Sequence, residues 1–463
     1  MKTDTIAAIA TAMSDSGIGI IRISGPEAVE VADRIFQTGS GHHRLREYET
    51  HTIHYGFLAD GEEILDEVMI SLMLAPRSYT KEDTVEINCH GGVLLLQKAL
   101  NLVLKNGARL AEPGEFTRRA FLNGRIDLSR AEAVMDLIHS RNEFALKASI
   151  RQLKGSLAEA VRKIRSEILY EIAFIESALD DPEHISTEGY PEKLSLTVDG
   201  LLDRLRRLLE SAEDGRLLKE GIRTVIVGKP NAGKSSLLNL LVGEERAIVT
   251  DVEGTTRDAL EESIRIGGIS LNVVDTAGIR DAQDVVEKIG VQKARKYAQD
   301  AELILYVVDS SRALDESDAE IMELIRDKKV IVLLNKTDLE PALSEESLRE
   351  QFGKWGEEIP VIRTSARENI GLEAFAEQIR KMFFHGKIGM DDEVMITSLR
   401  HREAVQEAYD SLCMVKRSLE DEMPEDFYSI DLMNAYASLG RILGEEVGED
   451  LVNEIFSKFC MGK

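Results

Sequence analysis

The chain has 463 residues, 43% of them hydrophobic, which is too long for a single core and predicts about two to four folded domains. Its formal net charge of −26 excludes a surface that binds phosphate backbones everywhere, so any nucleic acid must meet a local basic region or a partner protein. There is neither a signal-peptide pattern nor an apolar run of about 20 residues, and the three dispersed cysteines fit no metal spacing, so we expect a cytoplasmic chain with reduced thiols.

Residues 1–118 show the mixed pattern of an α+β domain. Apolar and polar residues alternate over 19–25 and over 84–90, which predicts two strands with one face on a core. Arg22 and Glu86 then lie on the polar faces of these strands. For this pair, the residues alone leave open both a solvated strand face and a binding site.

Further elements are expected in the same region. Residues 68–74 read as a strand, and residues 93–105 read as a helix that follows a glycine pair. Within the strand at 84–90, alternation assigns Val85, Ile87 and Cys89 to the core.

Helical periodicity follows over residues 128–180 and resumes over 194–210, with a link expected at 213–215. It returns over 394–420 and 430–459. We interpret these stretches as one helical bundle interrupted by an inserted domain, because domain termini often lie close together and insertion is tolerated. The apolar stripe expected to form the bundle core consists of Leu157, Val161, Ile164, Ile168, Ile172, Ile175 and Leu179.

Residues 118–165 form a basic segment in an otherwise acidic chain. They hold eleven Lys and Arg residues against five Asp and Glu residues, a net charge of +6. The pattern is compatible with contact to a nucleic acid and equally with a solvated helix face.

A phosphate-binding loop is predicted between a short apolar strand at 224–227 and an apolar helical pattern. Gly228, Gly233, Lys234 and Ser235 stand at the required places of G-x-x-x-x-G-K-S. The glycines let backbone N–H groups approach phosphate oxygens at a helix N-terminus, the lysine reaches the β- and γ-phosphates, and the serine hydroxyl binds Mg²⁺. Taken alone, the pattern also fits a glycine turn before a surface helix.

Three later motifs select a guanine nucleotide. Residues 275–278 read DTAG after an apolar strand, residues 335–338 read NKTD, and residues 364–367 read TSAR. The carboxylate of Asp338 accepts two hydrogen bonds from guanine, whereas adenine lacks those donors, a mismatch that sites turn into about 10⁴-fold discrimination. The sequence therefore predicts a GTPase domain with the order of motifs found in the translation-factor class.

The residue after DTAG departs from the common switch. Ras-type proteins place a water-orienting glutamine there, whereas Ile279 has no hydrogen-bonding group. Asn231 in the phosphate loop offers an amide oxygen to a monovalent cation, and backbone carbonyls near Thr250 and Val252 would complete its cage. Such a cation would offset charge between the β- and γ-phosphates. Asn231 is also compatible with a loop amide that bonds only backbone.

Over its whole length the chain resembles the tRNA-modification GTPases of the MnmE (TrmE) type. The resemblance implies a multidomain α/β protein with an α+β folate-binding-like N-terminal domain, a helical bundle domain and an inserted Ras-like P-loop GTPase domain. The matching segments are residues 19–25, 78–82, 86, 90–92, 113–117 and 119–123, the loop GKPNAGKSS, the stretch TDVEGTTRD, DTAGIR, and the tail at 459–463.

The resemblance implies a division at 1–118 for folate binding and dimerisation, at 119–214 with 385–463 for the helical domain, and at 215–384 for the GTPase domain. It also implies that a formyl- or methylene-tetrahydrofolate contacts Arg22, Glu86, Arg125 and Lys463. Arg125 stands where relatives carry Lys, which keeps the positive charge but replaces a compact ammonium group by a planar guanidinium group with several hydrogen-bond donors. The tail reads C-M-G-K where the family has C-I-G-K, an exchange of one apolar residue for another.

In the GTPase domain, the resemblance assigns residues to the nucleotide and two metals. Asn231, Lys234, Gly278 and the water-positioning Glu287 are the expected catalytic residues. The expected K⁺ ligands are Asn231, Thr250, Val252 and Thr255, and the expected Mg²⁺ ligands are Ser235 and Thr256. The expected GTP contacts are Asn231, Ala232, Gly233, Lys234, Ser235, Ser236, Thr250, Asp251, Val252, Glu253, Gly254, Thr255, Thr256, Asp275, Thr276, Ala277, Gly278, Asn335, Lys336, Thr337, Asp338, Ser365, Ala366 and Arg367.

The resemblance further implies a homodimeric, K⁺-stimulated GTPase that forms a heterotetramer with a FAD- and NADH-dependent partner of the MnmG (GidA) type. Together they would add a carboxymethylaminomethyl or aminomethyl group at C5 of the wobble uridine (position 34) of tRNA, with the carbon from the folate. Two alternatives remain at this stage: a ribosome-assembly GTPase of the Era or Der kind, and a self-associating GTPase with scaffold domains. Cys460 stands four residues from the end, as in a prenylation box, but a terminal Lys is atypical of that signal.

Overall fold

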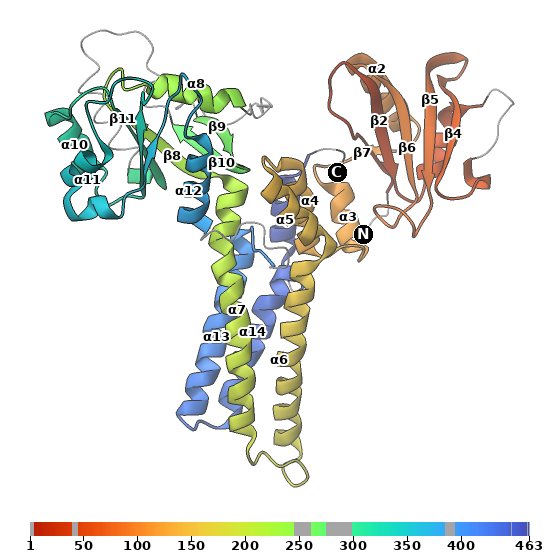
Figure 1. Cartoon of the computed structure of the whole chain (residues 1–463). Helices are drawn as coiled ribbons and strands as arrows, with labels where there is room; N and C mark the ends of the chain where they lie inside the picture. The colour runs from red at the N-terminus through yellow and green to blue at the C-terminus, as the bar shows by residue number, and fades with distance from the viewer. Residues whose placement is uncertain are drawn as a thin grey trace. The chain divides into compact units, whose positions relative to one another are not determined.

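The computed structural model describes residues 4–38, 45–244, 261–274, 299–384, 394–445, 447–460 and 462. The chain separates into two compact units (Figure 1). The first unit comprises Met1–Met135, Gln152–Pro191 and Met414–Lys463, and the second comprises Asp136–Arg151 and Glu192–Cys413. In the described part of the chain, every helix is too short or too polar to cross a membrane.

The first unit begins with a seven-stranded sheet in the order β3-β4-β5-β6-β2-β1-β7. Its pairs are antiparallel except for β1 with β7. All three expected strands are present, in β2, β5 and β6. The strands are β1 (Ile6–Ile9), β2 (Ser16–Ser24), β3 (Phe36–Gln37), β4 (Thr52–Asp60), β5 (Glu63–Met73), β6 (Thr84–Gly91) and β7 (Arg109–Leu110).

Two helices pack on this sheet, α1 (Ala28–Ile35) and α2 (Val93–Lys105). The second has the predicted bounds. Val85, Ile87 and Cys89 of β6 are all at most 3% exposed in the core that forms there, as alternation predicted. Burial raises the pKa of the Cys89 thiol to about 12, so this cysteine stays protonated at neutral pH.

Helices complete the first unit, and α6 and α14 lie side by side in Figure 1. The predicted apolar stripe of α6 is buried from Leu157 to Ile175, but Leu179 is 50% exposed, so its assignment to the core was wrong. Leu179 stands one residue before the last residue of α6, where the helix ends. The helices are η1 (Leu45–Glu47), α3 (Glu115–Leu122), α4 (Leu128–His139), α6 (Ser156–Asp180), α14 (Glu425–Leu443) and α15 (Glu449–Ser457).

The second unit is built on a six-stranded sheet in the order β13-β12-β11-β8-β10-β9. All neighbours are parallel except β9 with β10. Its central strands β11 and β12 are buried along their length and β8 is buried except at Arg223, because helices cover both faces of such a sheet. The strands are β8 (Ile222–Val227), β9 (Glu261–Ile266), β10 (Ile269–Val274), β11 (Leu303–Asp309), β12 (Val330–Asn335) and β13 (Val361–Arg363).

The helix that leads into this sheet is longer than expected. We expected a link at residues 213–215, but helix α7 continues through them to Glu220, one residue before Gly221, which has φ +86. Gly215 lies so close to the carbonyl oxygen of Ile396 that a Cβ would stand 2.0 Å from it, so close backbone packing explains this glycine better than a turn. The helices are α5 (Glu143–Lys154), α7 (Tyr190–Glu220), α8 (Lys234–Glu244), α10 (Glu316–Leu324), α11 (Glu345–Phe352), η2 (Gly353–Glu357), α12 (Leu372–Phe384) and α13 (Leu399–Glu420).

Candidate nucleotide site and N-terminal basic pocket

The loop between β8 and α8 has the backbone shape of a phosphate cradle. Gly228 (φ +150) and Gly233 (φ +98) occupy conformations that favour glycine. A Cβ on Gly228 would stand 2.4 Å from the Val307 carbonyl oxygen, and a Cβ on Gly233 would stand 2.2 Å from Asn335 Nδ2. Lys234 Nζ donates to the carbonyl oxygens of Gly228 and Lys229, both at 2.7 Å. The side chain thus folds over the loop, next to the first turn of α8 with its outward N–H groups.

The Asn-Lys-x-Asp loop after β12 is tied directly to this cradle. Asn335, 1% exposed, donates from Nδ2 to the carbonyl oxygen of Ala232 at 3.0 Å. Lys336 Nζ donates to the carbonyl oxygen of Asn231 at 2.8 Å. Two loops separated by about a hundred residues of sequence are therefore held as one surface.

The third loop, after β13, supports Asp338, the carboxylate predicted to read the base. Ser365 Oγ donates to Asp338 Oδ1 at 2.7 Å, and the carbonyl oxygen of Thr364 accepts from Thr337 Oγ1 at 3.0 Å. These bonds fix the direction of Asp338, and the second oxygen of its carboxylate makes no hydrogen bond within the described residues. Such a carboxylate matches the two donors of a guanine edge.

Sequence reasoning missed Asp309, the last residue of β11. Its Oδ2 accepts from Lys336 Nζ at 2.6 Å, so it holds the lysine of the Asn-Lys-x-Asp loop in place. Burial opposes ionisation of Asp309, but the bond from Lys336 and the bonds from Ser311 leave its pKa below the ordinary value. A buried strand that ends in Asp at the carboxyl edge of the sheet is the signal that could have revealed it.

The remaining predicted nucleotide and metal residues lie outside the described part of the chain. They are Thr250, Asp251, Val252, Glu253, Gly254, Thr255, Thr256, Asp275, Thr276, Ala277, Gly278 and Glu287, and Ile279 after the DTAG motif also lies outside the described part. Strand β10, which pairs with β8, ends at Val274, directly before the DTAG motif. Ser235 and Ser236 lie in the first turn of α8.

In the first unit, the two strand residues singled out by the sequence meet. Arg22 and Glu86 are partners across β2 and β6, and Arg22 Nε donates to Glu86 Oε1 at 2.8 Å. Arg22 Nη1 also donates to the carbonyl oxygen of Gly462 at 2.9 Å, which brings the C-terminal tail to this pair. The side chains of Arg22 and Glu86 are only about one fifth exposed, so a freely solvated strand face is wrong for them. Lys463 follows Gly462 but lies outside the described residues.

Tyr79, which sequence reasoning did not single out, connects this pair to Arg125. The Arg125 guanidinium lies 4.7 Å from the centre of the Tyr79 ring, and the Arg22 guanidinium lies 5.9 Å from it. Tyr79 Oη is hydrogen-bonded to Thr117 Oγ1 at 2.9 Å, which holds the ring between the two cations. Three of the four predicted folate contacts are described, and all three lie around this ring or its neighbour.

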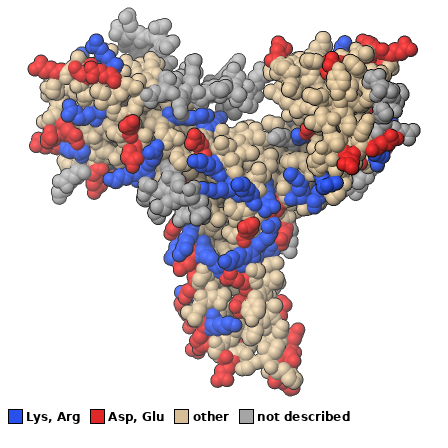
Figure 2. Space-filling model, turned by 45° about the vertical axis from the view of Figure 1, so that its right-hand side comes forward, with Lys and Arg blue, Asp and Glu red and all other residues tan. Residues whose placement is uncertain are grey.

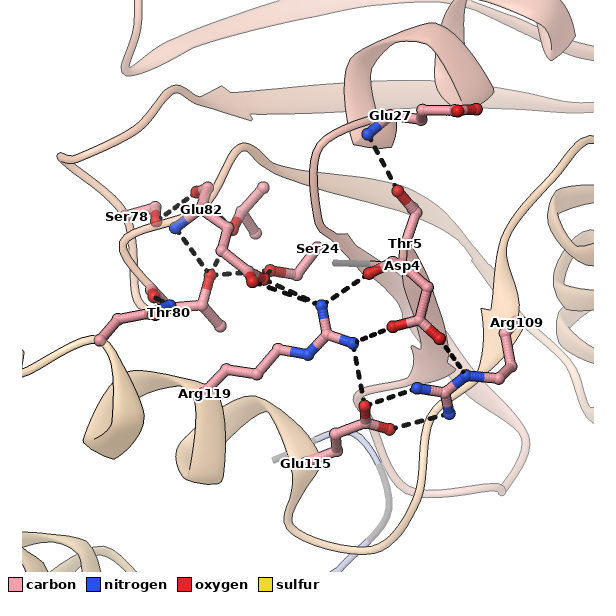
Figure 3. A network of polar contacts seen from close by, with 12 residues as sticks. Asp4, Thr5, Ser24, Glu27, Ser78, Thr80, Glu82, Arg109, Glu115 and Arg119 are labelled. Atoms are coloured by element: carbon pink, nitrogen blue, oxygen red, sulfur yellow. Dashed lines mark hydrogen bonds and ion pairs between the residues drawn. The ribbon is translucent and has the colours of Figure 1, made fainter. Parts of the chain in front are cut away.

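A separate ion-pair network holds α3 against the N-terminal sheet (Figure 3). Arg119 donates to Asp4, Glu82 and Glu115, and Arg109 donates to Asp4 and Glu115. The hydrogen bond from Arg109, with the second bond from Arg119, lowers the pKa of Asp4 to about 2 although burial opposes it. Because the two guanidinium groups and the carboxylates are engaged with one another, this network reads as structural.

The basic segment at 118–165 divides into two kinds of residue. Arg165 is buried and pairs with Glu445 at 2.6 Å, and the side chain of Arg119 is 12% exposed and pairs with Asp4, so neither faces a nucleic acid. In contrast, four cations are exposed and form no ion pair within the described residues: Arg141, Lys147, Lys154 and Lys163. Figure 2 shows, on one face of the molecule, Lys and Arg side chains in blue beside Asp and Glu side chains in red.

The fold and site together define a class. A parallel sheet with an antiparallel edge strand, a phosphate loop after β8 and a guanine-type carboxylate after β12 are the parts of a Ras-like P-loop GTPase. The chain is a GTPase of this class, and comparison with known proteins narrows the assignment.

The family described as GTP-binding protein TrmE N-terminus matches residues 5–125, and the MnmE helical domain family matches residues 128–460. The tRNA modification GTPase MnmE of Lachnoclostridium phytofermentans is 57% identical over 463 residues, covering 100% of both chains. The MnmE of Clostridioides difficile is 48% identical, and the match covers 99% of this chain and 99% of that protein. The MnmE of Bacillus subtilis is 44% identical, and the match covers 99% of this chain and 100% of that protein. The chain therefore belongs to the MnmE family of tRNA modification GTPases.

The match to the TrmE N-terminus also bears on the alternative of a ribosome-assembly GTPase, which was expected to lack such a domain. Among solved structures, the G domain of the T. maritima FeoB iron transporter is 28% identical and covers 35% of this chain and 97% of its own, with a TM-score of 0.27. That score is too low to say anything of the fold.

Proposed function

We propose that this chain is the K⁺-stimulated GTP-hydrolysing component of a complex that modifies C5 of the wobble uridine at position 34 of tRNA. With a FAD- and NADH-dependent partner of the MnmG type, it would add a carboxymethylaminomethyl or aminomethyl group whose carbon comes from a tetrahydrofolate. The observation that carries the proposal is the meeting of Arg22, Glu86 and the C-terminal tail in a chain that also holds a complete base-reading loop.

The described loops supply the expected contacts to GTP. Gly233 and the first turn of α8 present backbone N–H groups to phosphate oxygens, and Lys234 lies at the cradle with its ammonium available to exchange carbonyl partners for phosphate. Asp338, oriented by Ser365, reads the base. Ala366 and Arg367 continue this loop beside the base, and Ser236 continues the helix turn that follows Lys234.

The donor set near the phosphates suits two cations. Asn231 has a left-handed backbone (φ +62), fixed through its carbonyl oxygen by Lys336, and its exposed side-chain amide makes no hydrogen bond within the described residues. This supports its assignment to K⁺, together with Thr250, Val252 and Thr255. Ser235 in α8 supports the assignment to Mg²⁺ with Thr256. K⁺ would supply positive charge to the phosphates, and Glu287 would orient the attacking water in place of the glutamine that Ile279 replaces.

The N-terminal cluster suits a folate. The Arg22–Glu86 pair offers both donors and an acceptor, which match the amide-like edge of a pterin ring. Arg125, together with Lys463 as a predicted contact, would offer positive charge to the carboxylates at the other end of the folate. A 5-formyl or 5,10-methylene derivative would be the one-carbon donor, and the exposed cations Lys147 and Lys163 would meet tRNA phosphates.

We keep the division into three domains and the homodimer through residues 1–118 as parts of this proposal, together with the cytoplasm as the place where tRNA, folate and partner meet. Pairing of two GTPase domains across the K⁺ sites would couple hydrolysis to opening and closing of the complex, as lids do in other enzymes.

The decisive reconstitution contains the chain, an MnmG-type partner, FAD, NADH, GTP, unmodified tRNA and methylene-tetrahydrofolate labelled with ¹³C at its one-carbon group. Mass spectrometry of the nucleosides should find the label in the C5 substituent of uridine 34. Glu86→Gln should abolish the label while GTP hydrolysis continues. Unlabelled uridine from a mixture whose GTPase and flavin are both active would reject the proposal.

A further inference from the structure

The first unit has a pocket lined in part by Tyr79, whose ring lies near both Arg22 and Arg125. Its cavity volume is about 520 Å³, within the range of small-molecule sites. Its lining includes His51, Ser78, Tyr79 and three cations, Arg77, Lys81 and Arg125, and it includes no carboxylate.

The positive charge of this pocket is not neutralised by nearby acids. Glu82 is engaged by Arg119 and by Ser24 Oγ at 2.9 Å. Asp83 accepts from the backbone N–H of Ala75 at 2.9 Å. Within the described residues, Arg77, Lys81 and Arg125 form no ion pair, so three cations line the pocket with no acidic partner.

The backbone places Lys81 in the pocket at a conformational cost. Lys81 has φ +61, a left-handed conformation that is uncommon for a residue with a side chain. Its Nζ donates to the carbonyl oxygen of Gly124 at 3.1 Å, the residue before Arg125, so two cations stand side by side on the pocket wall. Residues in such sparsely populated backbone conformations cluster at ligand sites.

Tyr79 joins this pocket to the candidate folate residues. Its ring lies between Arg125 at 4.7 Å and Arg22 at 5.9 Å, so a ligand held at the Arg22–Glu86 pair that continues past this ring reaches the cations. The chemistry changes along this path. One end offers a donor and an acceptor to a polar ring, and the other end offers only positive charge.

A folate has the same polarity, with a hydrogen-bonding ring at one end and glutamyl carboxylates at the other. Intracellular folates extend this end by γ-linked glutamates, each of which adds one carboxylate. We propose that Arg77 and Lys81 bind the oligo-γ-glutamate tail, so that the chain selects polyglutamylated folates over the monoglutamate. This inference rests on the proposed folate function.

The test is calorimetric titration of full-length protein with 5-formyltetrahydrofolate that carries one, three or five glutamates. For wild type, the Kd should fall about tenfold from one to five glutamates, since each partly exposed ion pair contributes a factor of up to about five. In the double variant Arg77→Gln with Lys81→Gln, the gain should drop below about twofold, while the Kd for the monoglutamate stays unchanged. Lys98→Gln, on the exposed face of α2, is the matched control and should keep the full gain.

Three results would overturn the inference. One is equal affinity of wild type for all tail lengths, and another is equal weakening of monoglutamate and pentaglutamate in the double variant. The third is an intact tail effect in the double variant together with weaker tRNA binding, which would assign these cations to RNA. Failure of wild type to bind any form would instead reject the folate function itself. Unchanged GTP hydrolysis and thermal unfolding verify that the variants fold.

Discussion

The nucleotide site and the N-terminal site hold their ligand-binding groups in different ways. At the nucleotide site, Asn335 and Lys336 bind backbone oxygens of the phosphate loop, so its shape depends on the main chain. At the N-terminal site, Arg22, Glu86 and Tyr79 contact one another mainly through side chains brought together by strand register. A site of the first kind is encoded by short contiguous motifs, whereas one of the second kind depends on the whole domain.

This difference explains what the sequence could predict. The phosphate loop and the Asn-Lys-x-Asp loop each follow a buried strand, so their motifs predicted where in the fold these loops lie. Alternation along the strands also predicted that Arg22 and Glu86 point away from the core residues of β2 and β6, and the two are indeed partners across these strands. Tyr79 and Asp309 were missed because each gains its role only from a tertiary neighbour.

Other errors have the same origin. Residues 213–215 were expected to form a link, but they are helical. The glycine suggested a turn, whereas Gly215 instead allows close packing against the Ile396 backbone. Arg119 and Arg165 looked like members of an exposed basic segment, but each is held in an ion pair with a partner distant in sequence, Asp4 and Glu445 respectively. Net charge along a sequence does not distinguish a buried cation from an exposed one.

The largest effect should separate the two sites completely. Lys234→Ala should reduce GTP hydrolysis by about 10²–10³-fold, because it removes a charged donor at the phosphates. It should leave folate affinity unchanged. Lys381→Ala, an exposed lysine of α12, is the matched control for hydrolysis. Loss of folate binding in Lys234→Ala would show that the sites are not independent.

Exchange of K⁺ for Na⁺ at equal ionic strength should slow GTP hydrolysis by about 10²-fold, because the smaller Na⁺ would not fill a cage spaced for K⁺ and so would not place its charge at the phosphates. Asn231→Ala should hydrolyse GTP slowly in both salts, which a steady-state phosphate assay measures. Equal wild-type rates in the two salts would remove the cation from the account of this site.

Base recognition should depend on one carboxylate. Wild type should bind GTP about 10–100-fold more tightly than ITP, because inosine lacks the amino group that donates a charge-assisted hydrogen bond. In Asp338→Ala, the affinities for the two nucleotides should become similar, as competition with a fluorescent nucleotide would measure. A persistent preference would mean that another group reads the amino group.

The exposed cations of the basic segment should contribute a smaller effect. Lys147→Glu with Lys163→Glu should weaken tRNA binding and flatten the slope of log K against log salt by about two. Lys98→Glu serves as a charge-reversal control outside the segment. A slope equal to that of wild type would leave these lysines as a solvated helix face.

The smallest effect concerns the network that supports the N-terminal site. The pKa of Asp4 is lowered to about 2, so its contribution to stability is present above the ordinary value and is lost as the pH falls through about 2. Since the side chain is 43% exposed, Asp4→Asn should cost about 1 kcal/mol at pH 7 and clearly less at pH 3.

Urea unfolding of the full chain would measure this difference. Asp60→Asn, which removes an exposed ion pair with Lys105, is the matched control and should change stability little at either pH. A cost for Asp4→Asn that does not diminish in acid would indicate a packing role instead of a charge role.

The most direct test of the account is the affinity of the full-length chain for monoglutamyl 5-formyltetrahydrofolate. Wild type and Lys234→Ala should bind with the same Kd, and Glu86→Gln should bind at least about tenfold more weakly because a charged hydrogen-bond acceptor is lost. If Glu86→Gln bound as tightly as wild type, the cluster of Arg22, Glu86 and the tail would not be the folate site.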